Sequence, residues 1–136
     1  MGMPADFVSR ILTQGGITDI IGDRIFPLIV PEHVYSDPQD RRPCLVYQTA
    51  GSTRGKTFCA TDDLISEQFS VDCYAETYDA AKRLGDAVIA GVVDFSGVSG
   101  ATHIEAVFLD SEFDTVDLEP GLFRRNLALT VGHRTA

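Results

Sequence analysis

Three groups of residues in this 136-residue chain have types and spacings that could support chemistry. Residues 50–57 (Ala-Gly-Ser-Thr-Arg-Gly-Lys-Thr) match a relaxed phosphate-binding loop whose first glycine is replaced by alanine. Acidic residues concentrate at 110–119, where they could bind a cation or transfer protons. Three cysteines lie at positions 44, 59 and 73. Each group can act only if the helices and strands around it position it correctly.

The phosphate-loop match lacks the element on which its chemistry depends. Such a loop binds phosphate through backbone N–H groups of a helix that begins at its lysine and threonine. Here residues 58–63 follow, too few and without the apolar periodicity that a helix needs before the next strand-like run. The sequence therefore predicts that residues 50–57 form a weakly basic hairpin tip.

Five acidic residues form the second group: Asp110, Glu112, Asp114, Asp117 and Glu119. An EF-hand would require glycine where Thr115 stands and glutamate where Gly121 stands, so the calcium pattern is not met. Paired carboxylates can act as a general acid and base, but no histidine or nucleophile accompanies them here. This segment is predicted to be a solvated acidic loop, with no catalytic site and no bound metal.

The cysteines also predict no metal or cofactor site. They are separated by 15 and 14 residues, form no C-x-x-C pair, and lie away from the three histidines. Cys44 and Cys73 fall in strand-like runs, so both are expected to be small buried hydrophobic residues. Cys59 falls in a polar connection.

The hydrophobic pattern predicts one α+β domain spanning residues 1–136. Two amphipathic helices should pack on one face of a two-layer domain whose mainly antiparallel sheet has about four strands. Residues 51–63 are expected to be a long, mobile hairpin loop, and residues 96–100 a flexible connector. The predicted elements are a helix from Pro4 to the glycines at 15–16, a further helical turn at 17–21, an extended piece at 25–30, strands at 44–50 and 64–75, a helix after Thr77, and strands at 101–110 and 122–133.

Charge and hydropathy exclude several functions. The net charge of −9 disfavours nucleic-acid binding, which depends on lysine and arginine at phosphates. The longest uninterrupted apolar stretch has seven residues, at 87–93, whereas a membrane-spanning helix needs about 20. Residues 57–123 hold fourteen of the twenty acids but only two of the eleven bases. Such segregation favours head-to-tail contacts between copies of the chain, although it could also serve solubility alone.

Four short stretches, in this order and spacing, resemble the tail-completion (tail terminator) proteins of long-tailed bacteriophages and of related gene transfer particles. Tyr74 stands where that family often has tryptophan, and a longer proline-rich loop precedes Pro43. The stretches are Ile-Gly-Asp-Arg-Ile-Phe-Pro at 21–27, Arg-Pro-Cys-Leu-Val-Tyr-Gln at 42–48, Gln-Phe-Ser-Val-Asp-Cys-Tyr-Ala at 68–75 with Thr-Tyr-Asp-Ala-Ala at 77–81, and Phe-Asp at 113–114 with Leu-Phe-Arg-Arg at 122–125.

The resemblance implies a non-enzymatic virion structural protein. Family members form a ring, commonly of six subunits, that caps the tail tube and joins it to the head-side connector or stopper protein. DNA would pass through without specific binding, and the chain would move from the host cytoplasm into the tail or neck. Candidate ring-interface residues are Arg41, Arg42, Arg54 and Lys56.

The five acids at 110–119 are the residues we expect to face the ring lumen, because carboxylates repel DNA phosphates. A position on the outer rim, where they would only aid solubility, is the competing interpretation. The alternative function is a small cytoplasmic α+β ligand-binding or enzymatic domain that uses residues 50–57 or the acidic segment.

Overall fold

The structure, a computed structural model, describes residues 3–22, 24–28, 43–56, 61–100, 102–117 and 122–135. A sheet of six described strands, in the order β1-β2-β3-β6-β5-β4, forms one layer. Strand β1 (Ile25–Pro27) runs parallel to β2, and every other neighbouring pair is antiparallel. The remaining strands are β2 (Cys44–Lys56), β3 (Thr61–Ala75), β4 (Gly97–Ser99), β5 (Thr102–Asp117) and β6 (Leu122–Thr135).

The predicted α+β class is confirmed, but the count of four antiparallel strands is wrong. The added strands β1 and β4 have three residues each and lie at the two ends of the sheet order. The predicted extended piece at 25–30 contains β1, which pairs with Leu45–Tyr47. The expected flexible connector at 96–100 contains β4, which pairs with residues 102–104. A strand of three residues is too short to show apolar alternation, so the sequence pattern could not reveal either strand.

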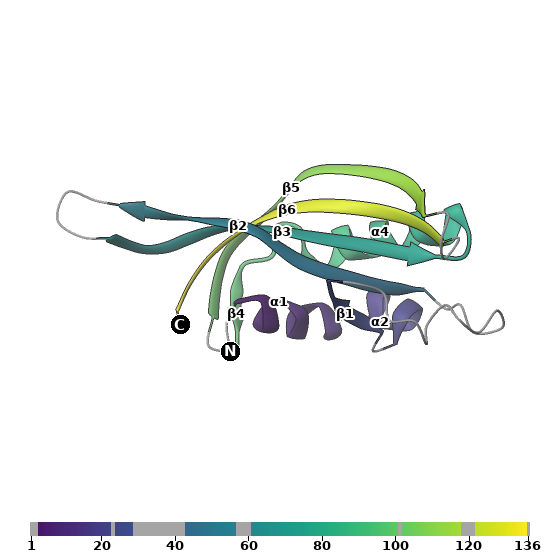
Figure 1. Cartoon of the computed structure of the whole chain (residues 1–136). Helices are drawn as coiled ribbons and strands as arrows, with labels where there is room; N and C mark the ends of the chain where they lie inside the picture. The colour runs from purple at the N-terminus through teal and green to yellow at the C-terminus, as the bar shows by residue number, and fades with distance from the viewer. Residues whose placement is uncertain are drawn as a thin grey trace.

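Three described helices cover one face of the sheet: α1 (Met3–Leu12), α2 (Gly15–Ile21) and α4 (Tyr78–Val92). Figure 1 shows α1 and α2 on one side of the long, curved strands, with α4 behind them. The expected helical turn at 17–21 is a separate helix, which makes three helices where two were expected. Thr77 caps α4 as predicted, because its side-chain oxygen accepts a hydrogen bond from the backbone N–H of Ala80.

The main core lies between this helix layer and the sheet. Phe69, at the middle of β3, is 1% exposed, and its ring centroid lies 4.9 Å from that of Phe7 in α1 and 5.8 Å from that of Tyr47. The alternation predicted for β6 is confirmed, since Leu127, Leu129 and Val131 all point into this core. A second, smaller cluster joins Cys44, Val46, Tyr74 and Leu122.

The hairpin between β2 and β3 differs from its prediction. Instead of a loop over residues 51–63, the strands continue to Lys56 and resume at Thr61, and pairs such as Thr53 with Ser66 link them. Alternating apolar residues mark strands that cover a core. This end of the hairpin extends beyond the helices (Figure 1), so its sequence shows no alternation. Residues 51–63 were expected to be mobile because they were expected to form a long loop. The strand pairing of residues 51–56 means that this reason no longer applies to them.

Cys44 and Cys73 are free thiols and fully buried, as predicted, whereas Cys59 lies outside the described residues. Burial raises the pKa of Cys44 from 9.0 to about 11, with Arg24 opposing part of the shift. Burial also raises the pKa of Cys73, and the neighbouring Asp72 carboxylate adds to the effect. Both thiols are therefore held neutral in the folded chain.

These two thiols predict a loss of stability at alkaline pH. Below pH 9 they are protonated in both the folded and the unfolded chain, so they add no pH dependence. Above pH 9 only the unfolded chain releases these protons, so the free energy of unfolding should fall as pH rises towards 11, by roughly 1.4 kcal/mol per unit of pKa difference. Urea titrations from pH 8 to 11 measure this slope. The Cys44→Ala/Cys73→Ala variant should lose much of it, and an unchanged slope in that variant would assign the effect to other groups.

Candidate assembly surface

Among the described residues, the two long edges of the sheet have no pairing strand over most of their length. Strand β1 covers β2 only at Leu45–Tyr47, and two backbone bonds flank it: the Leu28 N–H donates to the Tyr47 carbonyl at 2.9 Å, and the Leu45 N–H donates to the Arg24 carbonyl at 3.0 Å. Past Tyr47, no strand in the described part of the chain pairs with the outer side of β2. At the other edge β4 covers residues 102–104 of β5, and the Asp94 N–H donates to the carbonyl of Val107. Residues 48–56 and 108–117 are therefore the two free edges of the described sheet.

The basic candidates of the ring interface fall partly on the first free edge. Arg54 and Lys56 lie in β2, opposite Ile65 and Thr61 of β3. Arg41 and Arg42 lie outside the described residues. Residues 50–56, which match the phosphate-loop pattern, form part of strand β2. They therefore offer no helix N-terminus that could bind a phosphate. This removes the phosphate-loop basis of the alternative enzymatic interpretation.

The acidic candidates occupy the second free edge rather than a loop. Strand β5 continues to Asp117, so Asp110, Glu112 and Asp114 are strand residues, all with exposed side chains. Asp117 ends the strand, and Glu119 lies outside the described residues. The polar sequence concealed this strand because its helix side carries Glu112 and Asp114, which contact Arg125 and Tyr78 where a core strand would carry apolar residues.

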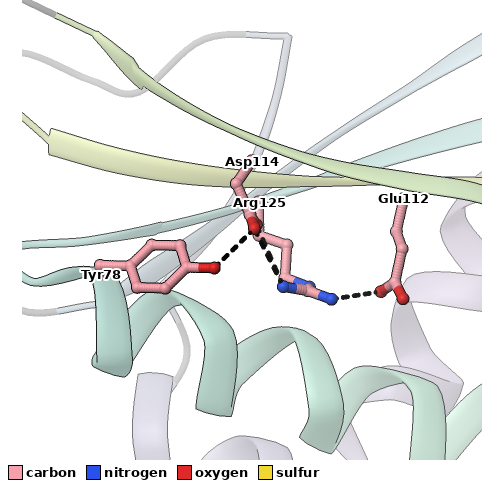
Figure 2. A network of polar contacts seen from close by, with 4 residues as sticks. All are labelled: Tyr78, Glu112, Asp114 and Arg125. Atoms are coloured by element: carbon pink, nitrogen blue, oxygen red, sulfur yellow. Dashed lines mark hydrogen bonds and ion pairs between the residues drawn. The ribbon is translucent and has the colours of Figure 1, made fainter.

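The pleat of β5 separates the three described acids. Asp110 lies at a register shift and accepts a hydrogen bond from the hydroxyl of Thr130, on the sheet face away from the helices. Glu112 and Asp114 lie on the helix side, where both bind Arg125 of β6 (Figure 2). The sequence had grouped these carboxylates together, and the structure places them on two faces.

Arg125 holds the acidic edge to the rest of the fold. Its Nη2 donates to Glu112 Oε2 at 2.7 Å, and its Nη1 donates to Asp114 Oδ1 at 3.1 Å. The Tyr78 hydroxyl, from the first residue of α4, donates to Asp114 Oδ2 at 2.9 Å. Figure 2 shows this chain of contacts running from α4 through β5 to the guanidinium. Hydrogen bonding to Glu112 raises the pKa of Arg125, so its charge is permanent.

Gly85 makes room for this arginine. A Cβ atom at position 85 would lie 2.6 Å from Cδ of Arg125, closer than real contacts allow. Glycine in the middle of α4 costs about 1 kcal/mol of helix stability relative to alanine. The chain therefore accepts a weaker helix so that Arg125 can pass beneath it to the edge strand. The sequence analysis did not identify this site, although Arg125 alternates in β6 with Leu127, Leu129 and Val131, and an arginine in line with buried apolar residues was the available signal for an acidic partner.

Two other polar pairs were missed by the sequence analysis. Asp72, which alternates in β3 with the buried Val71 and Cys73, is itself only 9% exposed and accepts a 2.6 Å hydrogen bond from Asn126. On the helix side, His133 lies 3.1 Å from Glu67 across β6 and β3, and both are largely buried. Both pairs join β3 to β6 in the middle of the sheet, and neither involves a residue of the β2 or β5 edge.

The described residues contain no group of three potential metal ligands. None of their helices is long and apolar enough to cross a bilayer. The described residues thus define a small α+β protein with a helix-covered sheet, in which two strand edges without a described neighbour carry residues of opposite charge.

The family model for Tail completion protein gp17 matches residues 6–133. The chain therefore belongs to this family of bacteriophage tail-completion proteins, and it is a virion structural protein. The resemblance seen in the sequence is confirmed.

The comparison with solved structures agrees on the fold. A chain in a structure titled "Virion of native gene transfer agent (GTA) particle" superposes with a TM-score of 0.77 at 10% sequence identity. The alignment covers 97% of this chain and 94% of that one, so the likeness extends over the whole domain. A search of curated protein sequences gave no match.

Proposed function

We propose that this chain forms a ring, of six subunits by analogy with its family, that caps the tail tube and joins it to the head-side connector. The observation that carries the proposal is the family match, which spans nearly the whole chain rather than one motif. The chain would act without catalysis, through contacts with its own copies, the tail tube protein and a connector or stopper protein. It would assemble in the host cytoplasm and remain in the tail or neck.

The separation of charge supports a ring of identical subunits. Opposite edges of the described sheet carry opposite charge, with basic residues on β2 and acidic residues on β5. A surface that fits a different surface of the next copy makes head-to-tail contacts, and these close into a ring when the rotation allows. Arg41, Arg42, Arg54 and Lys56 remain our proposed members of this interface.

The acidic candidates for the ring lumen that the structure describes differ in their surroundings. Glu112 and Asp114 share the single positive charge of Arg125 on the helix side of the sheet, which offsets part of their negative charge. Asp110 lies on the opposite face, so among the described acids it is the best placed to repel DNA phosphates. Such repulsion acts only within about 8 Å of the wall at physiological salt. We propose Asp110 as a lumen residue, with Asp117 and Glu119 as further candidates.

Genetic disruption tests the joining function. In the particle that encodes this chain, a deletion of its gene should produce filled heads and separate tails, and the wild-type gene supplied in trans should restore joining. Electron microscopy of lysates counts both species. Normal numbers of joined particles without the chain would contradict the proposal.

A further inference from the structure

We propose that the free edge of β2 in one copy pairs with the free edge of β5 in the next, so that the sheet continues from subunit to subunit. This inference rests on the proposed ring and specifies how its subunits meet. The partner is a second copy of this chain, and the contact is made by backbone hydrogen bonds flanked by complementary charges. Addition of a strand to an open edge is a recurrent mode of protein recognition.

The backbone of the described residues supplies the hydrogen-bonding groups for this contact. Residues 48–56 of β2 and 108–117 of β5 have one neighbouring strand each, so alternate N–H and C=O groups along them point outward. At about 3.3 Å per residue each edge extends roughly 30 Å, so the two are matched in length. Register shifts leave 51–54 and 111–117 as the regular stretches where pairing would be strongest.

The strand directions are also compatible. Strands β2, β3, β6 and β5 are consecutive neighbours, and each runs antiparallel to the next. Strands β2 and β5 of one chain therefore point in opposite directions. When copies are related by rotation about an axis along the strands, β2 of one copy meets β5 of the next in antiparallel orientation. The up-and-down alternation then continues through the ring.

The charges select this pairing over pairing of like edges. The free β2 edge holds two basic residues and no acidic ones. The free β5 edge holds four acidic residues and no basic ones, and it stays negative after the single charge of Arg125 in β6 is counted against Glu112 and Asp114. Two β5 edges would repel each other, as would two β2 edges, which disfavours closed symmetric dimers. Exposed sheet edges are usually protected by charge against unwanted pairing. Here the protecting charges are positive on the β2 edge and negative on the β5 edge. Only the pairing of a β2 edge with a β5 edge is therefore attractive.

Three of the exposed apolar side chains lie on the free β5 edge. Phe108 and Phe113 are 56% and 53% exposed, and Val116 is also exposed, all three in the free part of β5. On the β2 edge the described side chains are small or polar, with Gln48, Thr49 and Gly51 all exposed. A strand added beside β5 would cover part of the two phenylalanine rings. Burial of apolar area would then add to the backbone hydrogen bonds.

Hydrogen exchange of the full chain, below and above the concentration at which it assembles, tests the pairing directly. Amides in residues 48–56 and 108–117 should exchange at least about tenfold more slowly in the oligomer, because pairing removes them from water. Peptides from the centre of β3 should not change, since this strand already has neighbours on both sides.

Charge reversal provides the second arm of the test. The Arg54→Glu/Lys56→Glu variant should weaken assembly at least about tenfold at low salt, and so should Asp110→Lys/Asp117→Lys. A chain with all four substitutions should recover assembly, since the edges are again complementary. Asp19→Lys/Glu76→Lys, which makes the same charge change as Asp110→Lys/Asp117→Lys at exposed sites on neither edge, is the control for that variant and should assemble within about twofold of wild type.

The outcomes separate this inference from the proposed function. An oligomer that forms without added protection at either edge, or a four-substitution chain that fails to recover, would overturn edge pairing and leave the ring intact. Protection at only one edge would indicate a different partner surface and would also overturn it. A chain that stays monomeric at all concentrations contradicts edge pairing, whereas only normal joining without the gene contradicts the proposed function.

Discussion

Replacement of Phe69 by alanine is expected to destabilise the folded chain by about 3–5 kcal/mol. Phe69 is buried at the middle of β3, between Thr49 of β2 and Leu129 of β6. Its ring packs against Phe7 of α1 on one side and Tyr47 of β2 on the other. Truncation would therefore leave a cavity where the helix layer meets the sheet. A domain of this size has only about 5–15 kcal/mol of stability in total, so this loss is a large fraction.

Urea unfolding of the monomer measures this effect. Phe113→Ala is the matched control, because it removes the same ring from an exposed position on β5 and should cost less than about 1 kcal/mol. A loss below about 1 kcal/mol at position 69 would show that the helices do not pack on the sheet as described. The control also separates stability from assembly, since Phe113→Ala should weaken the oligomer while leaving the monomer stable.

Replacement of Arg125 by methionine is expected to cost about 2 kcal/mol of stability and to loosen the acidic end of β5. The guanidinium is nearly buried, while its partners Glu112 and Asp114 are about one-third exposed, so the loss should be smaller than for a fully buried ion pair. Without the arginine, two carboxylates remain close together and repel each other. The acidic end of β5 would keep its backbone pairing with β6 and the Tyr78 hydrogen bond to Asp114, but it would lose the side-chain contacts to Arg125.

A neutral triple variant separates charge from packing. Adding Glu112→Gln and Asp114→Asn to Arg125→Met should recover much of the lost stability, because an ion pair can often be replaced by neutral groups at little cost. Arg83→Met, on the exposed side of α4, is the control and should change stability by less than about 0.5 kcal/mol. If Arg125→Met behaves like that control, the contacts in Figure 2 contribute nothing to stability.

The elements that cover the core were predictable from the sequence. The apolar stripe of α4 and its Thr77 cap, the alternation in the second half of β3, and the alternation of β6 all have local signals, and the structure confirms each. Burial of Cys44 and Cys73 followed from the same patterns. These features depend on neighbours within one turn of helix or two residues of strand, which the sequence shows directly.

The sheet edges were not predictable in the same way. Residues 51–56 and 111–117 are strands without apolar alternation, because they lie at open edges and their partners are distant in sequence. The short strands β1 and β4 depend entirely on such long-range pairing. For the candidate site, the sequence identified the charged residues of both edges as groups. It could not show that Arg125 binds Glu112 and Asp114 while Asp110 lies on the other face.

A cryo-electron microscopy map of the completed particle tests the central claim most directly. We expect copies of this chain to form a closed ring at the head-side end of the tail tube, between the tube and the connector. The sheet edges β2 and β5 of neighbouring copies should face each other in that ring. A map that places the chain elsewhere in the particle, or at the junction as isolated copies without a closed ring, would contradict the proposed function.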